Sequence, residues 1–261
     1  MTEPAIHPRL REDTLSEVSF TLHYEGTATS EQVYSVLGQR QEITDRFTKG
    51  QRRNYQRLNV TVRSGQDVDV QNEEIPLEER NPHEPEFRFL TDAEDRIFWF
   101  SPRATGYVIN GAYPGWSEVL AELRMLLHPL HEAAGIERYT YFNLTFRNRI
   151  PWVEGGEAHV VREWLLPVMP PIPGVLAAIG TQKENTYRFP EGDHTLSLAY
   201  PVQDEDDSPA FISLDLQHIL DPVSPIEAPI DDLLVWLEIA HERIYQTFCN
   251  ALTEEFLRER S

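Results

Sequence analysis

Alternating apolar and polar residues predict several β-strands. Between Ser16 and Glu25 every second residue is large and apolar, with Ser19, Thr21 and His23 between them. This is the period of a strand with one buried face. Further strands are predicted over 58–62, 68–70, 87–90, 96–100, 107–109, 176–181, 185–189, 195–200 and 211–216. The closely spaced strands from 87 to 109 indicate an antiparallel meander.

The segment from Arg138 to Ile150 is the most β-like part of the chain, because aromatic and β-branched residues dominate it. We expect a long, central strand here. Its alternation places two sets on opposite faces, Tyr139, Tyr141, Asn143 and Thr145 on one and Thr140, Phe142, Leu144 and Phe146 on the other.

Apolar residues at helical spacing predict four helices. The first covers 30–48 and is capped by Ser30, and a short one covers 158–168. Another covers 116–134, ends at Gly135 and contains Pro129, which predicts a kink near 125–128. The last begins near Asp231 and carries one apolar stripe to the C-terminus.

Together these elements predict an α+β protein made of two related units. Each unit is expected to be an antiparallel sheet with helices packed on one face. Residues 1–166 form the N-terminal unit and 175–261 the C-terminal unit, which ends in the long helix. The proline-rich run 167–174 is the expected boundary. The order of elements partly repeats between the halves, and each half has a tryptophan on its helix, Trp116 and Trp236.

Composition narrows the class of protein. The 261 residues include 43 acidic and 23 basic side chains, which gives a net charge of -20. Such a charge disfavours nucleic-acid binding. The single cysteine, Cys249, excludes an intrachain disulfide and a cysteine-based metal cage. Without a signal peptide or a membrane-spanning stretch, we expect a cytoplasmic protein with no membrane association and no cofactor.

Four short motifs resemble a sporadically distributed, uncharacterised bacterial family of about this length. They are Glu17–Phe20, Trp116, Leu144–Ile150, and His241–Tyr245 with Phe248 and Leu252–Thr253. The family's strand motif has the form Arg-aromatic-x-Asn-Arg-Ile, and this chain departs from it at Phe146. The resemblance covers most of the chain and implies a single architecture, but no catalytic residue.

Arginines at the end of the predicted long strand form the leading candidate site. Arg147 and Arg149 share one face, about 7 Å apart, with Asn148 on the other face. Two guanidinium groups there could hold a carboxylate or a phosphate. Alternatively, they pair with the protein's own surplus acids and fix the strand end. Arg52 and Arg53 belong to a second basic cluster, which is an anion site or a solvated turn.

His128 and His131 are a weaker candidate, for a metal site. They are three residues apart on one predicted helix, a spacing that can place two imidazoles on one ion. The alternative is a pair of boundary histidines beside the helix kink. No glycine-rich phosphate loop, nucleophile elbow or calcium loop is present in the sequence.

Two functions follow from these observations. The first is a non-enzymatic, acidic interaction partner or regulator, such as an immunity or antitoxin-like binder of another protein. The second is an enzyme or small-ligand binder that holds an anion between the two units with Arg147 and Arg149. The long C-terminal helix could also mediate homo-oligomerisation.

Overall fold

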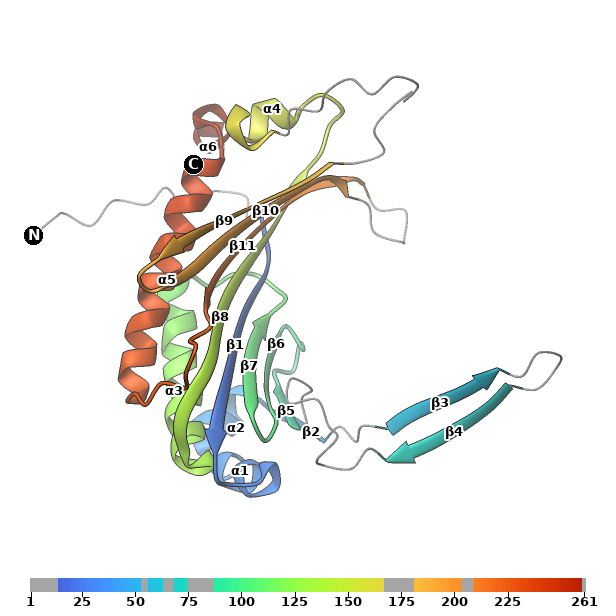
Figure 1. The fold of residues 1–261 in the computed structure, drawn as a ribbon, viewed down its shortest axis with the longest axis vertical. Helices are drawn as coiled ribbons and strands as arrows, with labels where there is room; N and C mark the ends of the chain where they lie inside the picture. The colour runs from blue at the N-terminus through green and yellow to red at the C-terminus, as the bar shows by residue number, and fades with distance from the viewer. Residues whose placement is uncertain are drawn as a thin grey trace, which may run out of the picture.

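The computed structural model describes residues 14–52, 56–62, 68–74, 87–166, 181–202 and 209–259. A nine-stranded sheet, antiparallel at every pairing, is its main feature (Figure 1). From edge to edge the strands are β2 (Lys49–Arg52), β5 (Phe87–Leu90), β6 (Arg96–Phe100), β7 (Ala104–Ile109), β1 (Leu15–Gly26), β8 (Ile136–Pro151), β11 (Phe211–Leu220), β10 (Gly192–Val202) and β9 (Thr181–Phe189). Two more strands, β3 (Gln56–Val62) and β4 (Val68–Glu74), pair only with each other.

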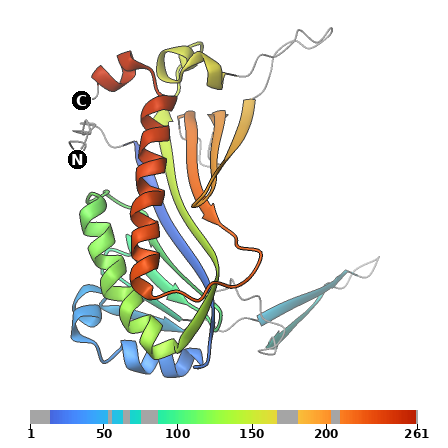
Figure 2. The ribbon, with the colours of Figure 1, turned by 60° about the vertical axis from the view of Figure 1, so that its left-hand side comes forward.

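The two long helices cover one face of this sheet. Figure 2 shows α3 (Trp116–Ala134) and α5 (Ile230–Ala251) side by side against it. Shorter helices lie at its ends: α1 (Ser30–Leu37), α2 (Gln41–Arg46), α4 (Glu157–Val160), the 3₁₀ turn η2 (Glu163–Leu165) and α6 (Glu254–Glu259). In the described part of the chain, no helix combines the length and apolar composition needed to span a bilayer.

Apolar side chains from the sheet and from the two long helices pack together in one core. Leu22 of β1 and Leu144 of β8 are fully buried, as are Leu126 of α3 and Leu237 of α5. Burying such a side chain contributes about 1.5–3 kcal/mol. The sheet and both helices are therefore held together mainly by apolar contact.

One buried polar cluster also ties α3 to the sheet. Glu122 of α3 accepts hydrogen bonds from Arg96 of β6 and from the Tyr107 hydroxyl of β7. Arg46 of α2 adds a bond of 2.6 Å from its Nε atom. Burial and the bond to Glu122 raise the pKa of Tyr107, so its hydroxyl remains a donor. Each buried charge thus has a partner, as a low-dielectric site requires.

The structure confirms the coarse sequence prediction, an α+β protein with an antiparallel sheet. The meander from β5 to β7 and the long strand β8 are present, and α3 continues through Pro129. The division into two units is not confirmed, because β8 and β11, one from each predicted unit, pair within the same sheet. The predicted boundary 167–174 lies outside the described residues.

Three predicted helices are wrong in extent. In place of the helix expected over 158–168, the described part of that segment has the short helix α4, which ends at Val160, and the separate 3₁₀ turn η2. The helix expected over 30–48 is interrupted at Gly38, whose N–H bonds to the carbonyl oxygen of Tyr34, and its N-cap is Thr29 rather than Ser30. The terminal helix stops at Ala251, because Leu252 leaves the helix and pairs with Val161. The break at Gly38 is local, because glycine has a low helix propensity, whereas at Leu252 a tertiary pairing overrides local helical preference.

Candidate functional site

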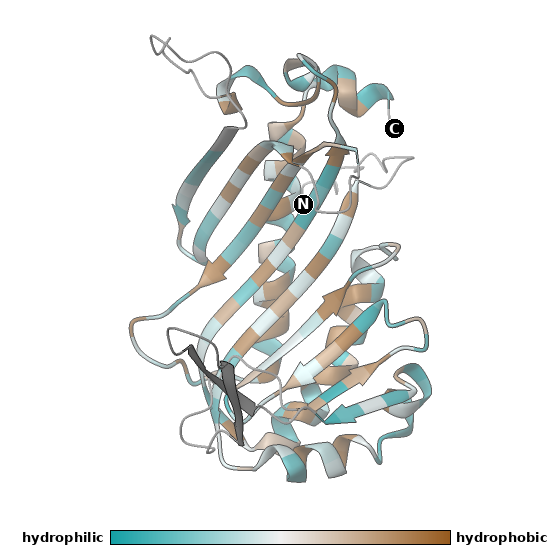
Figure 3. Cartoon of the chain, turned by 90° about the vertical axis from the view of Figure 1, so that its right-hand side faces the viewer, coloured by the Kyte–Doolittle hydropathy of each residue, from teal (hydrophilic) through white to brown (hydrophobic). Residues whose placement is uncertain are grey.

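The second face of the sheet has no helix over it in the described part of the chain. Figure 3 shows this open face, where polar and apolar residues alternate along the strands. In β1, Phe20 and Leu22 point into the core, while Thr21 and His23 are only partly buried. β8 continues the open face with Asn143 and other polar side chains. In the described structure, this polar sheet face is available for contact with another molecule.

A β-bulge lies between the two central strands, near the end of β1 and the start of β8. His23 pairs with Tyr141, but the next residue of β1, Tyr24, pairs with Tyr139, so Thr140 is an extra residue. Tyr139 is therefore turned into the core, where its hydroxyl lies 2.8 Å from Nδ1 of His131. Bulges bend strands and redirect side chains. This one corrects the sequence prediction, which placed Tyr139 beside Tyr141.

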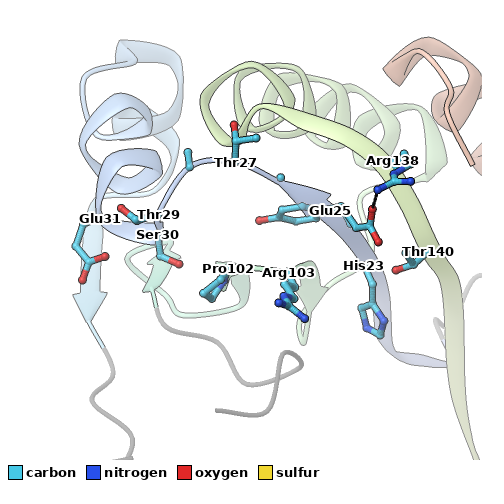
Figure 4. Close-up of a pocket in the computed structure, with 13 residues that line it drawn as sticks. His23, Glu25, Thr27, Thr29, Ser30, Glu31, Pro102, Arg103, Arg138 and Thr140 are labelled. Carbon is cyan, nitrogen blue, oxygen red and sulfur yellow. Dashed lines mark ion pairs between the residues drawn. The ribbon is translucent and has the colours of Figure 1, made fainter. Parts of the chain in front are cut away.

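Two neighbouring cavities lie at the bulge. The larger has a volume of about 760 Å³ and lies between the end of β1, the start of α1 and the turn before β7 (Figure 4). The smaller, of about 530 Å³, is lined by Thr21, Asn143 and Asp221, among others. His23 and Thr140 line both cavities. The two therefore form one groove, which we call the His23 groove.

Aromatic stacking provides a platform in the groove. The rings of His23 and Tyr141 are stacked, with centroids 4.6 Å apart and planes 24° apart. Burial raises the pKa of Tyr141, and the charge of Asp221 adds to this effect. The phenol therefore stays protonated at neutral pH. Rings and neutral polar groups are suited to binding a ligand through stacking and hydrogen bonds.

Charged side chains at the larger cavity are mostly paired. Arg138 lies 2.6 Å from Glu25, as Figure 4 shows by a dashed line, and Glu31 lies 3.1 Å from Arg52. Arg103, which is exposed in the turn before β7, has no ion-pair partner among the described residues. Among the described residues, the cavity therefore carries one positive charge without an ion-pair partner, within a strongly acidic protein.

The arginines predicted as a site lie elsewhere on the same sheet. Arg147 is half exposed, and its guanidinium lies 3.3 Å from Glu17 and 3.7 Å from Asp215. Arg149 stacks over the ring of Phe211, 4.6 Å from its centroid. The Asn148 amide is buried on the core side and donates to the carbonyl oxygen of Leu214. As predicted, Arg147 and Arg149 are exposed on one face of the strand and Asn148 is buried on the other. Arg147 forms ion pairs with two acidic residues of the same chain.

The second predicted basic cluster, which contains Arg52, does not lie beside Arg147 and Arg149. Arg52 lies on β2, the edge strand, and four strands separate it from β8. Its guanidinium pairs with Glu31 and also lies 5.7 Å from the ring of Phe87. Arg53 lies outside the described residues. In the described structure, Arg52 and the arginines of β8 therefore do not form one anion site.

The two histidines proposed as metal ligands have different neighbours. Nε2 of His128 lies 3.4 Å from Asp231, whereas His131 faces Tyr139. Burial lowers the pKa of His131. Among the described residues, a grouping of three ligand atoms is found instead at His159, Glu255 and Glu259. All three are exposed, and the two ring nitrogens of His159 on α4 each lie 3.4 Å from one of the two glutamates of α6.

Comparison with known proteins gives no further assignment. No family model, curated protein or solved structure matches the chain.

The sequence did not single out the residues of the His23 groove as a site. Alternation in β1 placed His23 on the polar face, but one histidine on a strand is an ordinary surface residue. Arg103 lies in a turn, and its proximity to the start of α1 depends on the pairing of β1 with β7. No local pattern predicts that pairing.

Proposed function

We propose that the protein is a non-enzymatic interaction partner or regulator of another protein, and that the open face of its sheet is the docking surface. The observation that carries this proposal is the polar sheet face with the His23 groove near one end of its two central strands, β1 and β8, uncovered in the described part of the chain. Within this proposal, an immunity or antitoxin-like binder is the class of protein that we favour. A cytoplasmic, bacterial setting is part of the same proposal.

Net charge indicates the kind of partner. A protein with a charge of -20 attracts a basic partner over long distances and accelerates encounter. The neutral and charged groups of the open face then fix the register of the complex. We therefore expect a partner with a basic surface around its contact region.

Photo-crosslinking tests the docking surface. We would introduce p-benzoylphenylalanine at Asn143, on the open face, and in a control variant at Val235, which is 56% exposed on α5. An adduct with a host protein is expected from position 143 and not from 235. Higher salt should reduce its yield, because screening weakens the attraction.

Charge reversal provides a matched control for the same experiment. Asp221→Lys changes the groove, whereas Glu238→Lys makes the same change of charge on the exposed surface of α5. Only Asp221→Lys should reduce the adduct strongly. Equal adducts from positions 143 and 235, or equal effects of the two substitutions, would exclude the open face as the docking surface.

The second candidate function is an enzyme or small-ligand binder that uses Arg147 and Arg149. Its support is the position of both residues on the open face, with Asp215 and Ser213 beside them. Replacing both arginines by alanine should then abolish stabilisation by an anionic ligand without unfolding the protein. Unfolding of the double variant would instead assign the arginines a structural role.

We also propose that the chain contains two related units, with the boundary moved to Gly135. The strand order supports this, because β1, β7, β6 and β5 run outward from the centre on one side, as β8, β11, β10 and β9 do on the other. In each half, three consecutive strands are followed by a long helix, α3 or α5. With this boundary, β8 is the first strand of the second unit.

A further inference from the structure

The start of helix α1 forms one wall of the larger cavity of the His23 groove. The first N–H groups of a helix have no acceptor within the helix. In α1 the side chain of Thr29 accepts from the N–H of Gln32, and its carbonyl oxygen accepts from Val33. This leaves the N–H groups of Ser30 and Glu31 without an acceptor among the described residues. Such groups favour an anion at this position.

The Ser30 hydroxyl is an independent sign of a ligand. The residue is 2% exposed, and its Oγ atom has no hydrogen-bond partner among the described residues. Figure 4 shows its side chain pointing from α1 toward Pro102, into the space that Arg103 also lines. Buried hydroxyl groups without a partner are uncommon in folded proteins, because the lost hydration is not replaced. A bound ligand would supply the missing partner.

Arg103 completes the set of donors. Arg103 lines the cavity from the turn between β6 and β7, and it is the charged side chain of the lining that lacks an ion-pair partner in the described structure. In the described part of the chain, the cavity thus combines one arginine without an ion-pair partner, one hydroxyl and a helix N-terminus. A single arginine matches a monoanion, since the surrounding charge of -20 disfavours a multiply charged group.

We propose that this cavity binds a carboxylate, namely the C-terminal carboxylate of a peptide segment of the partner. Arg103, Ser30 and the N-terminus of α1 hold the carboxylate. The preceding residues then cross His23 toward Asp221, whose carboxylate suits a lysine or arginine of the segment. This inference rests on the proposed docking function, and it specifies the group that is bound.

Titration of the full-length ¹⁵N-labelled protein tests the carboxylate site directly. The probes are N-acetylglycine and N-acetylglycinamide, which differ in the carboxylate alone. We expect N-acetylglycine, in the millimolar range, to shift the amide signals of Ser30 and Glu31, while the amide probe leaves them unchanged. No shift with either probe, or equal shifts with both, would overturn the proposal.

Variants separate this site from a general effect of charge. Arg103→Gln should weaken N-acetylglycine binding at least about tenfold, as expected for the loss of a charge-assisted hydrogen bond. Arg124→Gln removes the same charge from the exposed surface of α3 and should have no effect. Ser30→Ala should weaken binding and also raise the melting temperature, because it removes a buried hydroxyl that lacks a partner. A Ser30→Ala variant that binds normally would contradict the assignment.

Peptides distinguish the two sources of a carboxylate. N-acetyl-Lys-Gly-Gly with a free C-terminus should bind more tightly than N-acetylglycine, and Asp221→Asn should remove the difference. Equal affinities would favour a small free acid and overturn the peptide assignment. Because these titrations need no partner protein, failure of the carboxylate site and failure of the crosslinking experiment can be recognised separately.

Discussion

At the scale of single residues, the most unusual feature is a pair of histidines in the core. His194 of β10 and His218 of β11 are opposite each other, fully buried, with ring centroids 5.8 Å apart. Neither ring has a hydrogen bond of normal geometry among the described residues. Burial, the neighbouring His218 and Arg243 lower the pKa of His194 to about 4. Burial also lowers the pKa of His218, against the opposing effects of Glu191 and Asp193.

These histidines should make stability depend on pH. His194 is neutral in the folded protein, whereas in the unfolded chain it binds a proton below pH 6.5. The free energy of unfolding should therefore fall as pH decreases from about 6.5 to about 4. His194→Leu should reduce this fall by roughly 1 to 3 kcal/mol, measured by urea unfolding at several pH values.

A variant without any titratable group is the control for this prediction. Val235→Ala changes a side chain that is 56% exposed on α5, and it should leave the pH dependence between 6.5 and 4 close to that of the unmodified protein. If His194→Leu has the same pH profile as the unmodified protein, then another group causes the loss of stability in acid.

At the scale of elements, glycines decide where helices end and strands begin. Gly135 ends α3 with a φ of 58°, in the left-handed region, and β8 begins at the next residue. A side chain there would place its Cβ atom 2.5 Å from Oγ1 of Thr27. The junction between the longest strand and its preceding helix therefore requires glycine for conformation and for space.

Alanine substitutions can separate these two requirements. Gly155 has a φ of 74°, but a Cβ atom added there would meet no other atom within 4 Å. Gly155→Ala should cost about 1 kcal/mol from backbone strain alone. Gly135→Ala should cost at least about 1 kcal/mol more, because Thr27 must also move. Chemical denaturation of the two variants measures the difference, and equal losses would show that Thr27 moves freely.

At the scale of the whole molecule, net charge is the dominant property. The value of -20 already counts every arginine and lysine, so ion pairs such as Arg138 with Glu25 and Arg46 with Glu122 leave an excess of 20 negative charges. Repulsion among the remaining acids opposes the compact state. The apolar stripe of α5 is largely buried within the chain, and Val235 and Ile239 remain partly exposed on its outer surface. Self-association through this helix stays a prediction, which light scattering can test.

Salt should therefore stabilise the fold. Raising the salt concentration from about 10 mM to about 150 mM shortens the screening length from about 30 Å to about 8 Å. The melting temperature should rise by a few degrees, which corresponds to about 1 kcal/mol for a chain of this size. Sodium chloride and choline chloride should act equally if screening is the cause. A fall in melting temperature would mean that ion pairs contribute more than repulsion.

The sequence by itself determined most of the elements and the buried faces of β1, α3 and α5. Alternation fixed the core side of β1, and helical spacing fixed the stripes of α3 and α5, because local periodicity decides which side chains can be buried together. The same reasoning placed Arg147 and Arg149 opposite Asn148. Composition determined the acidic character of the surface.

Only the tertiary structure decided the strand order and the groove. The pairing of β1 with β8 joins segments more than 100 residues apart, as in Val18 with Phe146, and leaves no local signature. That pairing creates the bulge at Thr140. The pairing of β1 with β7 brings Arg103 to the cavity that Ser30 lines, although the two residues are distant in sequence. Periodicity describes which face of a strand is buried, but not which strand lies beside it.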